Sequence, residues 1–179
     1  MGHSRLVYKD LPSPLGPMIG GASENGLCLL EWHDRGGVDR IRERVIKRYK
    51  CDLASGTNRH LDQLESDLVA YFAGELTEFS APIDVTGTAF EQEVWRELLK
   101  IPFGATRSYG EMAAIMGKPG AARAVGRANG ANYLAIVIPC HRVIDASGGL
   151  HGYGGGLHRK KHLLELEARV AGQQRLPGM

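Results

Sequence analysis

The sequence predicts an α+β protein, in which a small N-terminal α/β domain with an antiparallel sheet precedes a mostly helical C-terminal domain. Short apolar runs broken by turn signals fill residues 6–32, and apolar residues then recur at helical spacing as far as residue 72. Helix-start signals dominate after residue 85. We therefore divide the chain into domains at 1–84 and 85–170, with a C-terminal tail at 171–179. A chain of 179 residues with 43% hydrophobic content can form a buried core.

Short strands are expected at the start of the N-terminal domain. The candidates are residues 6–9, 17–22 and 27–32. Asn25-Gly26 separates the last two and favours a tight hairpin, because both residue types tolerate positive φ. Two amphipathic helices follow, with apolar residues at Val38, Ile41, Val45, Ile46 and Tyr49, and at Leu61, Leu64, Leu68, Tyr71 and Phe72. This domain contains no constellation of chemically reactive residues.

Two capping-box sequences open helices in the C-terminal domain. The first, 88–91, predicts a helix from 89 to about 100 that buries Phe90, Val94, Leu98 and Leu99. The second, 108–111, predicts a short helix through Met116. Residues 117–120 interrupt the helical pattern, which resumes over 121–129. A helix, a turn with glycine and a second helix are the outline of a helix-turn-helix.

The second helix of this pair consists almost entirely of small residues, apart from Arg123 and Arg127. A helix that contacts base edges in a major groove usually offers Asn, Gln, Arg and Ser side chains. Small side chains instead allow the backbone to enter a narrow minor groove, and Arg123 is long enough to reach into the base stack. The alternative is a helix packed tightly inside a core.

The two halves of the chain differ in charge. Residues 1–84 carry 10 Lys and Arg against 13 Asp and Glu (net −3), whereas residues 85–179 carry 12 against 7 (net +5). The basic half suits a polyanionic partner, although solvated surfaces often carry such an excess. No stretch approaches the roughly 18 apolar residues of a membrane span, and the N-terminus lacks an apolar signal-peptide core. We therefore expect a cytoplasmic protein without a membrane partner.

The three cysteines are widely spaced and odd in number, which argues against a disulfide framework. A free cysteine is usually a small buried hydrophobe, and Cys28 and Cys51 are interpreted in this way. Cys140 differs because it follows Pro139 and an apolar run, 135–138, that is typical of a buried strand.

The residues that follow Cys140 are His141 and Arg142, whose positive charges can stabilise a thiolate. Such a thiol can act as a nucleophile. The segment Pro139-Cys140-His141-Arg142-Val143 resembles the active-site signature of the O6-alkylguanine-DNA alkyltransferases. The resemblance extends in order over residues 87–167 and includes 87–90, 101–110, 121–126, 152–157 and 159–160. In the N-terminal half it is looser, mainly at 13–16 and 71–76, and it implies a ribonuclease-H-like domain over 1–84.

The resemblance implies that Cys140 accepts the alkyl group from O6 of a damaged guanine, irreversibly and in a single turnover. His141 would activate the thiol through a water molecule, and Glu167 would polarise His141. Tyr109 would hydrogen-bond the flipped guanine and help neutralise charge as the base leaves. Backbone N–H groups in the glycine-rich loop around Gly154 would stabilise the leaving oxygen.

The resemblance also implies a set of DNA and substrate contacts. Arg123 would fill the space that the flipped base leaves, and Asn132 would hold the following turn through hydrogen bonds to the backbone. Lys160 would steady the flipped base or a phosphate. The other predicted contact residues are Ala122, Ala124, Gly126, Val143 and Tyr153. For Arg96 and Arg127, contact with the DNA backbone and simple solvation are equally favoured.

One residue departs from the family pattern at the site, because Tyr133 stands where most members have proline. We expect a looser turn or a changed edge of the lesion pocket, with activity kept. Some members hold zinc in the N-terminal domain, but Ser23 and Cys28 leave the ligand set incomplete, so neither a metal nor a cofactor is expected. Trp95 is expected in the core. Three histidines are expected to face solvent: His151, His158 and His162.

The expected partner is double-stranded DNA, bound through its minor groove by a monomer, with O6-alkylguanine as the substrate. O4-alkylthymine as a second substrate and cooperative binding along DNA stay open. One alternative is a non-reactive alkyltransferase-like binding protein, a group that lacks the acceptor cysteine present here as Cys140. The other is a cysteine hydrolase or redox enzyme, which would need an oxyanion hole for acyl chemistry or a resolving cysteine, and neither is visible.

Overall fold

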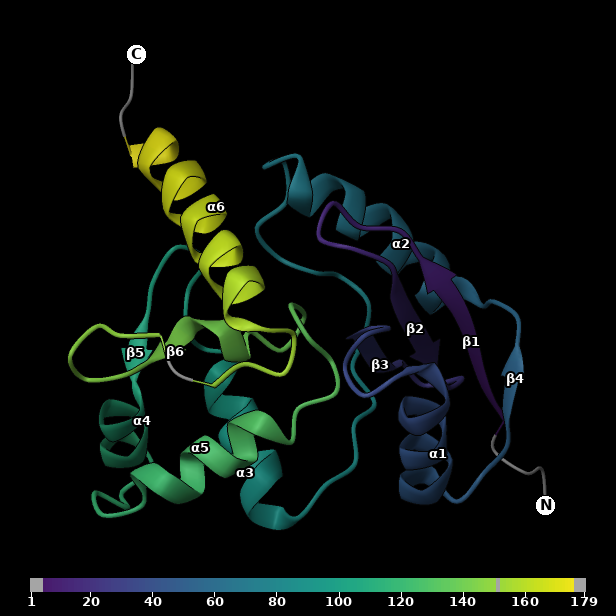
Figure 1. The fold of residues 1–179 in the computed structure, drawn as a ribbon, viewed down its shortest axis with the longest axis horizontal. Coiled ribbons are helices and arrows are strands. Elements are labelled where there is room, and N and C mark those ends of the chain that lie inside the picture. Colours follow the sequence, from purple (N-terminus) through teal and green to yellow (C-terminus); the bar gives the residue numbers. More distant parts are fainter. Residues whose placement is uncertain (1–4, 151, 176–179) are drawn as a thin grey trace. The chain divides into compact units, whose positions relative to one another are not determined.

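The computed structural model describes residues 5–150 and 152–175 of the chain. Residue contacts divide the chain into two units, Met1–Gly87 and Thr88–Met179. Figure 1 shows a sheet accompanied by helices in the first unit and a mainly helical second unit. No helix in the described ranges is long and apolar enough to cross a membrane.

The sheet of the first unit has four strands in the order β3-β2-β1-β4. Its strands are β1 (Leu6–Leu11), β2 (Met18–Ala22), β3 (Leu27–Trp32) and β4 (Leu53–Ser55). The first three pair in antiparallel fashion, but β4 pairs with β1 in parallel. The predicted α+β class is therefore confirmed, whereas the sheet is mixed rather than antiparallel. β4 was not predicted because three residues are too few to show an alternating pattern.

The predicted hairpin between β2 and β3 is present, but its glycine is needed for a different reason from the one expected. Asn25 and Gly26 are not among the described residues with positive φ. A Cβ atom at Gly26 would instead lie 2.5 Å from the carbonyl oxygen of Pro82, which accepts a hydrogen bond from Leu27. Close approach of a second chain segment therefore requires glycine at this position.

Two helices accompany the sheet, α1 (Val38–Tyr49) and α2 (Arg59–Phe72), as the apolar spacing predicts. α1 buries Ile41 and Val45, but Ile46 is exposed, so the apolar stripe is narrower than expected. α2 begins at Asn58, whose side chain accepts hydrogen bonds from the first-turn N–H groups. Its buried apolar residues are Leu61, Leu64, Leu68 and Tyr71.

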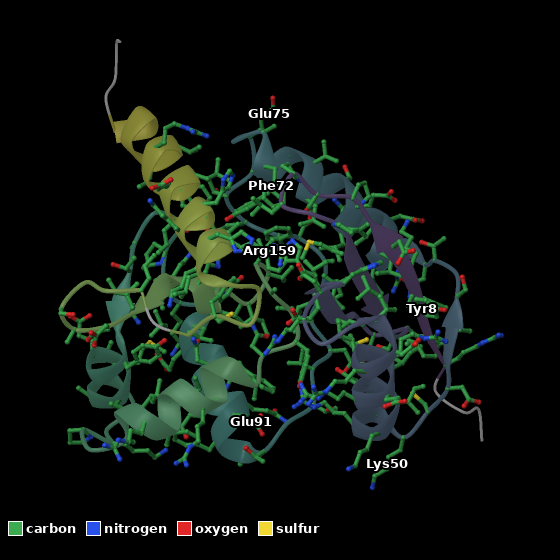
Figure 2. All side chains as sticks on the ribbon, in the orientation of Figure 1. Tyr8, Lys50, Phe72, Glu75, Glu91 and Arg159 are labelled. Atoms are coloured by element: carbon green, nitrogen blue, oxygen red, sulfur yellow. The ribbon has the colours of Figure 1, made fainter. Side chains whose placement is uncertain are left out.

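The second unit contains four α-helices among its described residues: α3 (Ala89–Leu98), α4 (Tyr109–Ile115), α5 (Ala122–Gly130) and α6 (Leu157–Arg175). Both predicted capping boxes are present, at Thr88 with Glu91, which is labelled in Figure 2, and at Ser108 with Glu111. α6 includes residues 171–175 of the predicted tail, and residues 176–179 lie outside the described ranges.

The interior of this unit differs from the prediction at Leu99, the C-cap residue of α3, which is exposed. Val94 and Leu98 are buried as predicted, and Phe90 is half-buried. Trp95 is buried as expected, and its indole N–H donates to the carbonyl of Ala128 at 2.9 Å. This bond joins α3 to α5.

The apolar run 135–138 is buried, but it is not the expected strand. It forms consecutive turns, and Ile136 has a φ of +70°. A β-branched residue rarely adopts this left-handed conformation, because its Cβ crowds the backbone. The run leads into a short 3-10 helix, η1 (Cys140–Arg142), and a two-residue strand, β6 (Val143–Ile144), which pairs in parallel with β5 (Arg107–Ser108).

Candidate active site

Cys140 is the first residue of η1 and is buried, with 5% of its surface exposed. Its backbone N–H donates to the carbonyl of Ile138 at 2.8 Å, which forms a tight turn across Pro139.

The other two cysteines belong to the first unit. Burial raises the pKa of Cys28 to about 12, and the pKa of half-buried Cys51 is also raised by burial. Neither thiol therefore forms a thiolate readily at neutral pH.

Cys140 is followed directly by a buried ionic cluster of His141, Arg142 and Glu167. His141 Nε2 lies 2.7 Å from Glu167 Oε1. Arg142 donates from Nε to Glu167 Oε2 at 2.8 Å and from Nη2 to Oε1 at 2.9 Å, and its Nη1 donates to the carbonyl of Ile101. α6 supplies Glu167, so the cluster ties η1 to the last helix.

Arg142 makes contacts that its place in the sequence did not predict. Its guanidinium donates two hydrogen bonds to the Glu167 carboxylate. The sequence predicted only that the charge of Arg142 can stabilise the Cys140 thiolate. Glu167 is therefore a shared partner of His141 and Arg142. Two polar residues close to Cys140 were not among the predicted site residues, namely Arg142 as a partner of Glu167 and Asn129. No local sequence signal identifies either one, because both contacts depend on folding.

The cluster shifts the pKa values of its members in ways that suit a neutral histidine beside a charged carboxylate. Burial lowers the pKa of His141, although the Glu167 hydrogen bond opposes the shift. Burial alone would raise the pKa of Glu167, but the contacts with His141 and Arg142 outweigh it and lower that pKa to about 2. When Nε2 of a neutral imidazole donates to a carboxylate, Nδ1 carries the lone pair. Nδ1 of His141 is buried and has no hydrogen-bond partner among the described residues.

Lys160 and Tyr109 also lie near Cys140, whose charge affects the pKa of both. Lys160 is fully buried, and its Nζ donates to the carbonyl of Val143 at 2.7 Å and lies 6.0 Å from the centre of the Tyr109 ring. Burial lowers the pKa of Lys160, while the charge of Cys140 opposes that shift. Burial and the charge of Cys140 both raise the pKa of Tyr109, which is half-buried. Burial makes contact between Lys160 and a DNA phosphate unfavourable.

Asn132 makes hydrogen bonds to the backbone of the following turn, as the family resemblance implies. Its Oδ1 accepts from the N–H of Leu134 at 2.9 Å, and its Nδ2 donates to the carbonyl of Ile138 at 3.0 Å. The side chain thus spans the strained turn at Ile136 from both ends. Tyr133, in place of proline, is half-buried beside it.

α5 presents charged and small residues on its accessible surface. Arg123 and Arg127 are exposed, and Ala122, Ala124 and Gly126 are half-buried. A Cβ atom at Gly126 would lie 3.8 Å from ring carbons of Tyr109, so the helix passes beside that ring. Val125 and Ala128 are buried on the opposite side. α5 is therefore partly in the core and partly accessible, which combines the two predicted alternatives.

The glycine-rich loop connects the site to α6. Tyr153 is half-buried, Gly154 is exposed, and Gly156 has a φ of +91°. Arg159, labelled in Figure 2, donates from Nη1 to the carbonyl of Gly155 at 2.9 Å and so holds the loop against the first turn of α6.

The remaining predicted residues lie outside this cluster. His158 and His162 are exposed as predicted, and His151 lies outside the described residues. Arg96 is exposed on α3. Within residues 5–150 and 152–175, no group of three or more His, Cys, Asp or Glu side chains is arranged to hold a metal ion.

Known proteins resemble the chain over both units. Residues 89–169 match the family model described as 6-O-methylguanine DNA methyltransferase, DNA binding domain. Residues 6–85 match the model of the ribonuclease-like domain of the same methyltransferases. The Mycobacterium leprae methylated-DNA–protein-cysteine methyltransferase is 67% identical over 159 residues, which cover 89% of this chain and 90% of that protein. The Salmonella typhimurium protein of the same name is 42% identical over 91% of this chain and 96% of its own length.

A solved structure resembles the fold as well. The Mycobacterium tuberculosis OGT, crystallised in complex with DNA, superimposes with a TM-score of 0.79 and 46% identity. The match covers 92% of this chain and 94% of that one.

Proposed function

The chain belongs to the O6-methylguanine DNA methyltransferase family, and we propose that Cys140 is the residue that accepts the alkyl group. By its family the chain is a DNA-binding methyltransferase that repairs alkylated DNA. The relatives' name specifies a protein cysteine as the acceptor. Three cysteines are available, and the choice among them rests on their surroundings.

The observation that carries the assignment is the position of Cys140 directly before His141, whose imidazole forms a buried pair with Glu167. Cys140 and His141 are adjacent in η1, and Nε2 of the His141 imidazole lies 2.7 Å from Oε1 of Glu167. Cys28 and Cys51 belong to the other unit, where burial raises both pKa values. Only Cys140 combines a thiol with an oriented base, as nucleophilic catalysis requires.

His141 acts as the base in the proposed reaction. Its lowered pKa keeps the imidazole neutral at pH 7, and Nε2–H donation to Glu167 leaves Nδ1 as the proton acceptor. The thiol proton would reach Nδ1 through a bridging water. Glu167, with a pKa of about 2, remains a carboxylate and stabilises the imidazolium that forms.

The transfer is a displacement at the alkyl carbon. The Cys140 sulfur forms a bond to that carbon as the carbon–O6 bond breaks, and the electron pair stays on the guanine. That developing negative charge needs a hydrogen-bond donor. The raised pKa of Tyr109 keeps its phenol protonated and able to donate to the flipped base. Lys160, held beside the Tyr109 ring, supplies positive charge to the same region.

The product is a thioether on Cys140, which water does not cleave. None of the residues around Cys140 offers a means to restore the thiol, so each molecule repairs one lesion. The base must also leave the duplex to reach a buried thiol, which costs a few kcal/mol of unstacking.

The proposal is tested with duplex DNA that carries one labelled O6-methylguanine. After incubation with excess DNA, peptide mass mapping should place one methyl group on Cys140 and at most one per molecule. Repeated turnover would support a hydrolase instead, and binding without transfer would support a non-reactive damage-recognition protein. A methyl group on Cys28 or Cys51 would show that the acceptor is assigned wrongly.

α5 is the proposed DNA contact, through the minor groove. Its half-buried alanines and glycine bring the backbone close to the surface, and Arg123 projects from its first turn. Arg123 would occupy the space of the flipped base and stabilise the extruded state. Tyr153, Gly154 and Val143 would line the pocket for the base, with Gly154 N–H near the leaving oxygen.

Arg123→Ala should therefore slow transfer from duplex DNA on the order of 10-fold, because the flipped state loses its support. Transfer from a single-stranded oligonucleotide, whose bases are already unstacked, should change little. Both rates are measured in single-turnover assays with the same lesion. An equal loss on both substrates would mean that Arg123 acts on the chemistry rather than on base flipping.

We further propose that the chain acts as a monomer in the cytoplasm, a reducing compartment in which the thiols of Cys28, Cys51 and Cys140 stay reduced. Sedimentation with and without DNA would show whether binding adds further copies along the duplex.

A further inference from the structure

Asn129 is a buried polar residue in the last turn of α5, with 5% of its surface exposed. Its Nδ2 donates to the carbonyl oxygen of Cys140 at 3.2 Å. Its Oδ1 is buried and has no hydrogen-bond partner among the described residues. The hydrogen bond that this side chain makes is therefore with the main chain of the proposed acceptor.

The orientation of this amide is determined by Cys140. Rotating the amide by 180° would bring Oδ1 against the Cys140 carbonyl, and two acceptors repel one another. Only Nδ2 can face that carbonyl. The cost of this orientation is an Oδ1 atom that is removed from water without a donor.

Stability alone does not explain an asparagine at this position. A buried acceptor without a partner is unfavourable, and an apolar side chain of similar volume would avoid that penalty. The neighbouring inward residues of α5, Val125 and Ala128, are apolar. The contribution of Asn129 therefore lies in the segment that its side-chain hydrogen bond holds.

That hydrogen bond completes a pair of amide contacts on either side of Pro139. Asn132 holds the carbonyl of Ile138, and Asn129 holds the carbonyl of Cys140. Pro139 has no N–H of its own with which to fix the segment. Both asparagines lie in or just after α5, so the two contacts connect this helix to the backbone that carries the thiol.

We propose that Asn129 is a positioning residue for alkyl transfer, which aligns the Cys140 main chain with α5 and hence the thiol with DNA bound to that helix. The inference rests on the proposed function, in which Cys140 is the acceptor and α5 contacts DNA. Small displacements of a nucleophile reduce rates steeply, because the attack on carbon must be in line.

The test compares Asn129→Leu and Asn129→Asp with the unmodified protein. Leucine removes both polar atoms and keeps the branch point at Cγ, whereas aspartate keeps the shape but replaces the donor with an acceptor. For each protein, the thermal midpoint, the affinity for undamaged duplex DNA and the maximum single-turnover rate at saturating lesion DNA are measured.

Asn129→Leu should unfold at the same or a higher temperature and bind undamaged DNA as before. Its maximum rate should nevertheless fall on the order of 10-fold, because the thiol is no longer aligned. Asn129→Asp should lose at least as much rate, since its carboxylate repels the Cys140 carbonyl. A rate that falls only in a variant with a lowered thermal midpoint would assign Asn129 a structural role and overturn the proposal.

The two proposals fail in different ways. If the unmodified protein does not methylate Cys140, the proposed function is wrong. If it does, and Asn129→Leu transfers at the same maximum rate, the proposed function stands and the positioning role of Asn129 is refuted.

Discussion

Replacing Cys140 with alanine should abolish alkyl transfer and leave the affinity for duplex DNA within about twofold of the unmodified protein, because phosphate contacts dominate affinity. The thiol is 5% exposed and does not belong to the accessible surface of α5. Labelled O6-methylguanine duplex measures the transfer, and a mobility-shift titration at fixed salt measures the affinity.

The chain offers two matched controls for this experiment. Cys28→Ala and Cys51→Ala remove the other thiols and should transfer the label at the normal maximum rate, since neither residue belongs to the buried His141–Glu167 neighbourhood. Residual transfer by Cys140→Ala, or loss of transfer in either control, would contradict the assignment of the acceptor.

Replacing Glu167 with alanine should have the largest effect on stability, on the order of 3–5 kcal/mol, because it leaves the buried charge of Arg142 without its partner. Chemical denaturation of the purified protein measures the loss. Glu167→Ala should also lose most of its transfer rate, since His141 no longer has the carboxylate that sets its tautomer.

A double substitution separates charge burial from packing. Arg142→Met in the Glu167→Ala background removes the uncompensated charge and should recover part of the stability, although not the transfer rate. If the double variant is as unstable as Glu167→Ala, the Arg142 charge is not the cause of the loss.

The same cluster predicts how stability depends on pH. The pKa of Glu167 is lowered from 4.5 to about 2, which corresponds to about 3 kcal/mol of stability at neutral pH. This contribution is complete above pH 4.5 and is lost as the pH falls towards 2. His141, whose pKa is lowered from 6.5, adds a separate loss that begins below pH 6.5, where the unfolded chain binds a proton that the native site resists.

Glu167→Gln isolates the lower of these two pH ranges. Without a titrating carboxylate, the variant should lose less stability than the unmodified protein between pH 4.5 and 2. Free energies of unfolding at a series of pH values test this. Parallel profiles for the two proteins over that range would mean that Glu167 does not have its lowered pKa.

The site could be predicted from the sequence where neighbours along the chain define it. Cys140 and His141 are adjacent, whereas the backbone bonds that Asn132 makes were implied by the family resemblance. Glu167 was implied by family resemblance rather than by spacing. The bonds from Arg142 to Glu167 and from Asn129 to Cys140 join residues 25 and 11 positions apart, and no periodicity specifies them.

The sequence by itself determined those features whose energy comes from interactions over three or four residues. The capping boxes at Thr88 and Ser108, the apolar stripe of α2 and the turn before α5 are of this kind. Each depends on residues that lie a few positions apart in the sequence, so local rules predict it.

Only the tertiary structure decided the features in which distant segments compete with local preference. The apolar run 135–138 has the composition of a strand, yet it turns with Ile136 at positive φ, spanned by the hydrogen bonds of Asn132. β4 is a strand because β1 lies beside it, and Arg142 faces Glu167 because α6 brings a carboxylate to it. In each case burial and long-range hydrogen bonds contribute more free energy than the local propensity, which is why the sequence pattern alone gives another answer.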